Sequence, residues 1–254
     1  MRLQNRVAIV TGAGSGIGYA IAKKLSEEGA LVCVNYLGFA EQAQALAQQL
    51  TAVGQKAIAV QADVSNAQQV QQMVQATVEQ LGPLDIIVNN AGIEQATPFL
   101  EMEESQWEKV VGVNLKGTFL CSQAAARAMV KRKQGRIINI SSIHEDIVFI
   151  NHADYAASKG GLRMFMRTIA QELAPYNITV NNICPGAIET PINKETLESS
   201  GLMKELVAEI PLSRLGKPEE VAELAVYLAS DAASYISGAS LFIDGAMSIK
   251  SGGL

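Results

Sequence analysis

The sequence predicts an α/β fold in which helices cover both faces of a parallel sheet. Short aliphatic runs such as Val7–Val10 and Leu84–Val88 alternate with longer amphipathic stretches such as Ile17–Leu25. Aliphatic runs without polar alternation are typical of strands buried on both sides. The chain has 254 residues, 48% hydrophobic and 18% charged, a composition that favours a packed core over disorder.

Seven strands and the helices between them follow from this pattern. The strands are expected at Val7–Val10, Leu31–Val34, Ala57–Val60, Leu84–Val88, Arg136–Ile140, Ile178–Ile183 and Leu241–Asp244. Helical spacing predicts helices over Ile17–Leu25 (with Gly29 at its C-cap), Ala43–Leu50, Val70–Leu81, about Leu115–Met129 and about Tyr155–Ala174. Ser105 and Glu108 resemble a capping box that opens a further helix, and Pro218 stands where a helix would start.

Residues 1–254 are expected to form a single domain, because α/β folds of this length are often one unit. The one long stretch without a clear assignment is about residues 188–215. Long segments of this kind in compact domains often bind ligands or act as lids. We therefore expect a substrate loop or lid there.

Charge and apolar runs exclude several classes of protein. The net charge is -5 and no basic block is present, which argues against a nucleic-acid surface. The N-terminus does not resemble a signal peptide, and no apolar run approaches the length of a bilayer span. The three scattered cysteines, Cys33, Cys121 and Cys184, show no metal or redox spacing. We expect a cytoplasmic protein without a metal site.

A glycine-rich loop, Thr11–Gly18, lies between the first strand and the first helix. It does not match G-x-G-x-x-G, but it matches G-x-x-x-G-x-G. Glycines permit a tight turn and let a pyrophosphate approach the backbone, and the helix N-terminus offers free N–H groups. The loop predicts a dinucleotide site. The cofactor-binding residues expected here are Gly12, Ser15, Gly16, Ile17 and Gly18.

The end of the second strand does not decide between NAD and NADP. Dinucleotide folds often place Asp or Glu there to hold the ribose 2′-hydroxyl, but this strand ends Asn35-Tyr36-Leu37. No carboxylate specifies NAD and no Arg or Lys specifies NADP. Asn35, Tyr36 and backbone N–H groups near Gly38 are the candidates for contact with either cofactor.

Tyr155 and Lys159 are four residues apart, on one face of a predicted helix. A phenol has a pKa near 10, and an adjacent ammonium lowers it. The pair is suited to take a proton from an alcohol, or to give one to a carbonyl, near neutral pH.

These motifs together resemble the classical short-chain dehydrogenase/reductase family over essentially the whole chain. The matching residues are Thr11–Gly18, Asp63 and Val64, Asn89–Gly92, Asn114, Ser142, Tyr155, Lys159, Pro185, Gly186 and Thr190. The resemblance implies a Rossmann fold and an enzyme that moves hydride between a CH–OH group and NAD or NADP. Homotetramers are common in the family, so it also implies a homotetramer.

The resemblance also implies residue roles. Tyr155 would be the general acid/base, Lys159 would lower its pKa and hold the nicotinamide ribose, and Ser142 would bind the reacting oxygen. Asn114 would hold a water of a proton relay. The cofactor contacts it implies beyond the glycine loop are Asp63, Val64, Asn89, Ala91, Gly92, Tyr155, Lys159, Pro185, Gly186, Ile188 and Thr190.

Within the family, the sequence is similar to bacterial glucose 1-dehydrogenases. The similar segments are Ala91–Glu94, Ser141–Glu145, Tyr155–Gly161 and Pro185–Asn193. In that interpretation Glu94, His144, Glu145 and Asn193 would bond sugar hydroxyls. The sequence departs from those enzymes at Leu37, where they usually carry arginine, at Asp154, which replaces a histidine, and in its shorter C-terminal tail.

Other functions stay open at this stage. One is a reductase acting on 3-oxoacyl groups bound to carrier protein, and another is a different polyol or ketone reductase. A catalytically inactive nucleotide sensor is the most distant alternative. It would be expected to lack Ser142, Tyr155 or Lys159, and all three are present.

Overall fold

Seven aliphatic segments pair into one sheet in which every neighbouring pair of strands is parallel. The structure, a computed structural model, describes residues 1–52, 54–191 and 199–249. The strands are β1 (Val7–Val10), β2 (Leu31–Tyr36), β3 (Ala57–Gln61), β4 (Leu84–Asn89), β5 (Gly135–Ile140), β6 (Ile178–Pro185) and β7 (Ser240–Ile243). All seven predicted strands are confirmed, and their ends shift by one or two residues.

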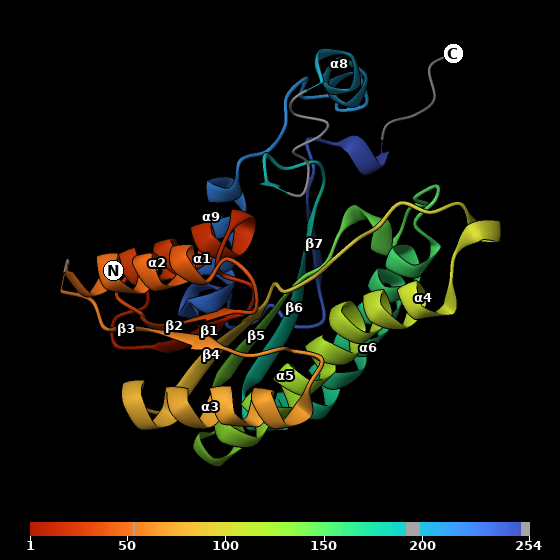
Figure 1. Cartoon of the computed structure of the whole chain (residues 1–254). Helices are drawn as coiled ribbons and strands as arrows, with labels where there is room; N and C mark the ends of the chain where they lie inside the picture. The colour runs from red at the N-terminus through yellow and green to blue at the C-terminus, as the bar shows by residue number, and fades with distance from the viewer. Residues whose placement is uncertain (53, 192–198, 250–254) are drawn as a thin grey trace.

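Helices cover both faces of the sheet, as Figure 1 shows. Their bounds are α1 (Gly16–Glu27), α2 (Ala40–Ala52), α3 (Ala67–Leu81), α4 (Glu104–Val111), α5 (Thr118–Met129), α6 (Ala153–Leu173), α8 (Ser200–Ala208) and α9 (Pro218–Ala229). One core packs α1, α2 and α9 against the sheet, and the other packs α3, α5 and α6. The predicted single-domain α/β Rossmann fold is therefore confirmed.

The strand order, β3-β2-β1-β4-β5-β6-β7, reverses between β1 and β4. The chain builds outward from β1 to β3 and then returns to the other side of β1. In open α/β sheets, ligands bind at such a reversal, outside the carboxyl ends of the strands. The fold thus places the binding crevice beside the glycine-rich loop that follows β1.

One local prediction about the helices after β4 was wrong. Ser105 is not the N-cap of α4. The cap is Glu103, whose carbonyl oxygen accepts from Gln106 N–H and Trp107 N–H, so Ser105 lies in the first turn. The helix expected from about Leu115 to Met129 is confirmed as α5, and a π-helical turn at Gly112–Gly117 joins it to α4. Such turns insert one extra residue into a helix and often mark functional positions.

The described part of the expected substrate loop lies at the carboxyl edge of the sheet. Ile188 forms a parallel bridge with Gly216, and Glu189 N–H donates to the carbonyl oxygen of Gly216. These contacts bring both ends of the segment together after β6. Figure 1 shows α8, which belongs to this segment, beyond the ends of the strands. Asn193 lies outside the described residues.

Two further features bear on the class of protein. Over the described ranges, no helix combines the length and the apolar character that crossing a membrane requires. In the same part of the chain, no group of three or more His, Cys, Asp or Glu side chains is arranged to hold a metal ion.

Candidate active site

The loop after β1 packs directly on the loop after β4. The hydroxyl oxygen of Thr11 accepts from Asn90 N–H at 2.9 Å and from Ala91 N–H at 3.0 Å. Gly12 has a φ of +62°, and a Cβ added there would lie 2.9 Å from Ala91 Cα. Only glycine allows this backbone conformation and this approach without strain. The two loops are therefore locked together where the strand order reverses.

The side chain of Asn90 holds the glycine loop through hydrogen bonds to its backbone. Its amide nitrogen donates to the carbonyl oxygens of Thr11, at 2.9 Å, and Gly12, at 3.1 Å. A Cβ on Gly18 would lie 2.4 Å from that nitrogen, so glycine is required there as well. Helix α1 starts at Gly16, and Ser15 makes no side-chain cap. The first N–H groups of α1 are thus available to an anion.

The predicted nucleotide-binding residues gather around one cavity beside this loop. Its lining includes Gly12, Ser15, Asp63, Val64, Ala91 and Gly92, together with Gly14, Leu37, Gly38 and Phe39. A helix N-terminus, a close-packed glycine loop and an adjoining cavity fit a dinucleotide, with its pyrophosphate at α1.

Three predicted cofactor residues have side chains that are bonded within the protein. Asn35 accepts from Gly12 N–H and donates to the carbonyl oxygens of Val60 and Ala62. Tyr36 is buried in the core, where its hydroxyl accepts from Gln44. Asn89 is also buried and donates to Ser122 and Asn139. Asn35 lines the nucleotide cavity, whereas Tyr36 and Asn89 line neither this cavity nor the catalytic one, and cofactor contact by the three residues stays a prediction.

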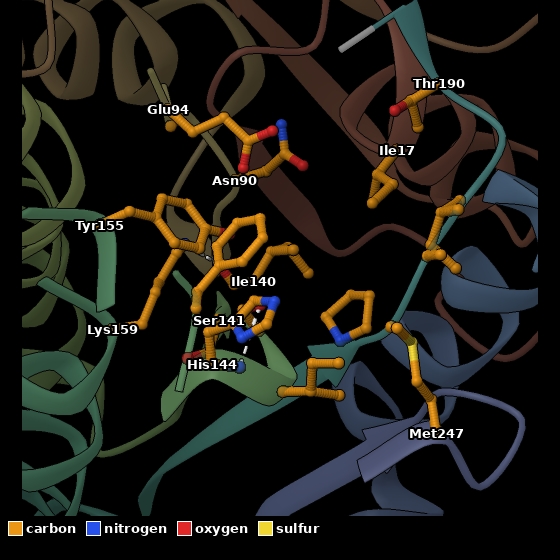
Figure 2. A pocket seen from close by; sticks show the side chains of 18 of the residues that line it. Ile17, Asn90, Glu94, Ile140, Ser141, His144, Tyr155, Lys159, Thr190 and Met247 are labelled. Carbon is orange, nitrogen blue, oxygen red and sulfur yellow. Dashed lines mark hydrogen bonds between the residues drawn. The ribbon is translucent and has the colours of Figure 1, made fainter. Parts of the chain in front are cut away.

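A second cavity holds the predicted catalytic residues. Ser142, Tyr155 and Lys159 line it, as do Ile17, Gly92, Pro185, Gly186, Ile188 and Thr190 from the predicted cofactor set. Figure 2 shows Tyr155, Lys159 and Glu94 on one side of this cavity and Ile17 and Thr190 across from them. Residues from five different stretches of the chain meet here, because β1, β4, β5 and β6 end at the same edge.

Lys159 is buried, and its Nζ donates to the carbonyl oxygen of Ile140, at the end of β5, at 3.0 Å. The ammonium lies 5.3 Å from the centroid of the Tyr155 ring. Burial lowers the pKa of Lys159 from 10.5 to about 8, because the charged form loses hydration. The ammonium of Lys159 therefore loses its proton more readily than that of an exposed lysine.

Burial acts in the opposite direction on Tyr155 and raises the pKa of its phenol above the ordinary value. A hydrogen bond with Ser142 lowers that pKa, and the charge of Glu94 raises it further. Forming a phenolate therefore requires positive charge nearby, which Lys159 and the oxidised nicotinamide ring supply when the dinucleotide is bound.

Asn114 lies in the π-helical turn, with its side chain buried. Its amide oxygen accepts from Ile93 N–H, and its amide nitrogen donates to the carbonyl oxygen of Ile93, each at 2.9 Å. The nitrogen also donates to the hydroxyl of Ser158, on α6, at 3.2 Å. Asn114 thus ties the loop after β4 to the helix that carries Tyr155 and Lys159.

The predicted substrate residues have different outcomes. Glu94 and His144 line the catalytic cavity, whereas Glu145 does not. The carboxylate of Glu145 is buried behind β6, where it accepts from Asn182 at 2.8 Å and from Ser240 at 2.5 Å. Substrate contact by Glu145 is therefore corrected. Asn193, in the part of the chain that is not described, stays a prediction.

An aromatic stack that was not predicted from the sequence lies beside Tyr155. His144 stacks on Phe149 with ring centroids 4.0 Å apart, and Phe149 stacks on His152 at 3.7 Å. Phe149 also meets the edge of Tyr155 at 6.1 Å. The stack forms one wall of the cavity. Two histidines flanking an aromatic residue just before the Tyr-x-x-x-Lys pair were the available signal.

The chain matches the family model described as enoyl-(acyl carrier protein) reductase over residues 12–248. A short-chain dehydrogenase/reductase from Mycobacterium marinum is 36% identical, with a TM-score of 0.91 and 96% of each chain covered. The chain belongs to the classical short-chain dehydrogenase/reductase family. Members of this family act on CH–OH groups and use NAD or NADP. The fit of both cavities to a dinucleotide agrees with this.

Other relatives show the range of activities within the family. A gluconate 5-dehydrogenase from Burkholderia cenocepacia, in complex with NADP and tartrate, is 35% identical, with a TM-score of 0.93 and 98% of each chain covered. A variant of a Serratia marcescens short-chain dehydrogenase/reductase is 39% identical, with a TM-score of 0.91 and coverage of 98% of this chain and 100% of that chain. Similarity at this level establishes an NAD(P)-dependent oxidoreductase.

The cofactor preference should respond to charge at residue 37. Leu37 is 58% exposed and borders the nucleotide cavity, and a Cβ at Gly38 would have no neighbour within 4 Å. Leu37→Arg should raise the ratio of kcat/KM for NADP to that for NAD by about 10-fold, because a charge-assisted bond to the 2′-phosphate contributes roughly 1.5–3 kcal/mol. Steady-state kinetics with both cofactors measures the ratio.

Leu100→Arg is the matched control, because Leu100 is 96% exposed and borders neither cavity. It should leave the ratio unchanged. An unchanged ratio in the Leu37 variant would mean that the 2′-position of the cofactor's adenosine ribose does not lie beside residue 37.

Proposed function

We propose that the protein catalyses the reversible, NAD(P)-dependent oxidation of a hydroxyl group of a neutral sugar or polyol, as glucose 1-dehydrogenases do. This proposal rests on the polar side chains that line the catalytic cavity. Glu94 and His144 line it, and Figure 2 shows them on either side of Tyr155. A polyol is recognised by such donors and acceptors, because analogues that leave them unpaired bind poorly.

In this proposal, Tyr155 transfers the proton at the reacting oxygen. The Ser142 hydroxyl bonds the same oxygen and stabilises the charge that develops on it. Lys159 supplies the positive charge that makes the phenolate accessible. The dinucleotide, when bound, accepts or donates the hydride. Asn114 holds the loop after β4 against α6. It would also hold a water molecule through which Lys159 exchanges its proton with solvent.

The charge of the cavity favours a neutral substrate over a sugar acid. Among the described residues that line the cavity, the acidic and basic side chains are Glu94 and Lys159. Burial raises the pKa of Glu94 above its usual value, and the charges of His152 and Lys159 offset part of that rise. When it is ionised, Glu94 repels a substrate carboxylate, whereas it accepts hydrogen bonds from sugar hydroxyls.

A second candidate is a reductase of 3-oxoacyl thioesters. The apolar part of the cavity wall, formed by Phe149, Leu206 and Met247, favours it. An acyl chain would lie against these side chains. Such an enzyme would run in the direction of reduction, with Tyr155 donating the proton to the ketone.

The role of Tyr155 is tested by Tyr155→Phe. The variant removes only the hydroxyl, so kcat should fall by roughly 100- to 10,000-fold, the usual contribution of a positioned acid/base. Cofactor binding, measured by isothermal titration calorimetry, should persist. Full turnover in a variant that binds the cofactor normally would contradict the assignment.

The substrate is tested by following reduced-nicotinamide absorbance with each cofactor against D-glucose, other sugars, polyols, gluconate, secondary alcohols and a 3-oxoacyl thioester. A neutral sugar or polyol should give the highest kcat/KM. Glu94→Gln should lower that value about 10-fold, because a hydrogen bond to a charged group is worth roughly 1.5–3 kcal/mol. The same substitution should also lower the ratio of kcat/KM for the neutral substrate to kcat/KM for gluconate.

Glu79→Gln, on the exposed face of α3, is the control. It should change neither kcat/KM for the neutral substrate nor the ratio of that value to kcat/KM for gluconate. The highest kcat/KM with gluconate or with the thioester would show that the neutral-polyol proposal is wrong.

A homotetramer is part of the proposal. Phe119 on α5 and Phe165 on α6 stack edge to face, with ring centroids 6.3 Å apart. Phe119 is 39% exposed, and Met164 beside them is 59% exposed. Apolar residues gathered on adjacent helices favour burial against another copy. Light scattering should give four times the chain mass of 27.0 kDa, and a stable monomer would contradict this.

A further inference from the structure

A row of buried amides crosses the sheet beneath the catalytic cavity. Asn89 on β4 is the register partner of Asn139 on β5, which is the partner of Asn182 on β6. Asn182 in turn is the partner of Ser240 on β7. The three asparagines are buried among aliphatic strands. Buried amides are costly unless they are bonded, and among the amide atoms of this row Asn89 Oδ1 alone has no hydrogen-bond partner.

Hydrogen bonds along the row all run in one direction. The amide nitrogen of Asn89 donates to Asn139 Oδ1 at 2.8 Å, and that of Asn139 donates to Asn182 Oδ1 at 2.9 Å. The amide nitrogen of Asn182 donates to Glu145 Oε2 at 2.8 Å. The hydroxyl of Ser240 donates to the other carboxylate oxygen, Oε1, at 2.5 Å. The row therefore ends on Glu145.

A group that only accepts hydrogen bonds explains this common direction. An ionised carboxylate has no proton to donate, so every amide in the row must turn its nitrogen toward Glu145. Aligned hydrogen bonds of this kind polarise one another and stabilise the charge at the end. The side chain of Glu145 has no exposed area, and Arg163 Nε lies 3.7 Å from its carboxylate. The geometry thus indicates a buried, ionised carboxylate.

The turn that carries this carboxylate packs against α6, the helix that carries Lys159. Glu145 ends the short turn Ile143–Glu145 that follows Ser142. Lys159 Nζ is bonded to Ile140, the last residue of the strand before that turn. Desolvation lowers the pKa of Lys159, whereas negative charge at Cys184, Glu145 and Glu94 raises it. Burial raises the pKa of the Cys184 thiol, which stays neutral near pH 8. Of the two carboxylates, Glu145 is the one that the buried amide row holds and whose side chain has no exposed area.

We propose that Glu145 is a positioning residue for the reaction: a buried counter-charge, oriented by the amide row, that keeps Lys159 protonated where burial alone would neutralise it. It touches neither substrate nor cofactor and acts only through Lys159. This inference rests on the proposed role of Lys159 in assisting Tyr155. It does not depend on which alcohol is the substrate.

The direct test is the pKa of Lys159 in wild-type protein and in Glu145→Gln. Heteronuclear NMR of lysine-labelled protein gives this pKa without any substrate, and Lys159→Arg assigns the signal. Glu145→Gln keeps the shape of the side chain and removes its charge. It should lower the pKa of Lys159 by roughly one unit, as expected when a nearby opposite charge is lost. Glu145→Asp keeps the charge and should leave the pKa close to wild type.

Asp146→Asn is the matched control, because Asp146 is the adjacent carboxylate, is 51% exposed and is bonded to Arg163. It should leave the Lys159 pKa unchanged. With any alcohol that the wild type oxidises, Glu145→Gln should also move the acidic limb of the kcat/KM profile to higher pH. Loss of the ammonium makes the Tyr155 phenolate harder to form, so oxidation needs a higher pH.

A folded Glu145→Gln variant with the wild-type Lys159 pKa would overturn the proposal. If that variant does not fold, Glu145→Ala gives the same comparison, because it also removes the charge. The Lys159 pKa should again fall, and no shift would overturn the proposal. If no alcohol is oxidised, the proposed function fails while the NMR result still decides this inference.

Discussion

The contact between the loops after β1 and β4 is the constraint on which the site depends. The hydroxyl oxygen of Thr11 accepts hydrogen bonds from two backbone N–H groups of the loop after β4. The side-chain nitrogen of Asn90 donates two hydrogen bonds to the loop after β1. These four bonds fix the glycine loop where the strand order reverses. They hold the start of α1 open toward the nucleotide cavity, and they fix Gly92 and Glu94 opposite the end of β5.

A second constraint connects the other strands of the site. The amide row holds β4, β5, β6 and β7 in register through side chains as well as through the backbone. Asn114 fastens the same β4 loop to α6. Tyr155 and Lys159 thus stand on a helix that is bonded to Asn114 through Ser158 and to the end of β5 through Lys159. Pre-organisation of this kind keeps reacting groups in position before the substrate arrives.

The sequence predicted the strands well because a parallel sheet buried on both faces leaves continuous aliphatic runs, such as Ile86–Val88. It predicted the glycine loop and the Tyr155–Lys159 pair because their spacing reflects local geometry. It did not predict the role of Glu145. Its neighbours Asn182 and Ser240 are distant in the chain, and only strand pairing brings them to the carboxylate. The bonds that Asn35 and Tyr36 make within the protein were not predicted for the same reason, since their partners lie on other elements. The start of α4 was missed because a backbone carbonyl, that of Glu103, opens it.

The central claim is that one dinucleotide joins the start of α1 to Tyr155 across both cavities. A crystal structure of the protein with bound NADP tests this most directly. The pyrophosphate should lie against the first N–H groups of α1, with the nicotinamide between Thr190 and Tyr155 and its reacting carbon within about 3.5 Å of a bound substrate carbon. A pyrophosphate bound away from α1, or a nicotinamide directed away from Tyr155, would contradict the account.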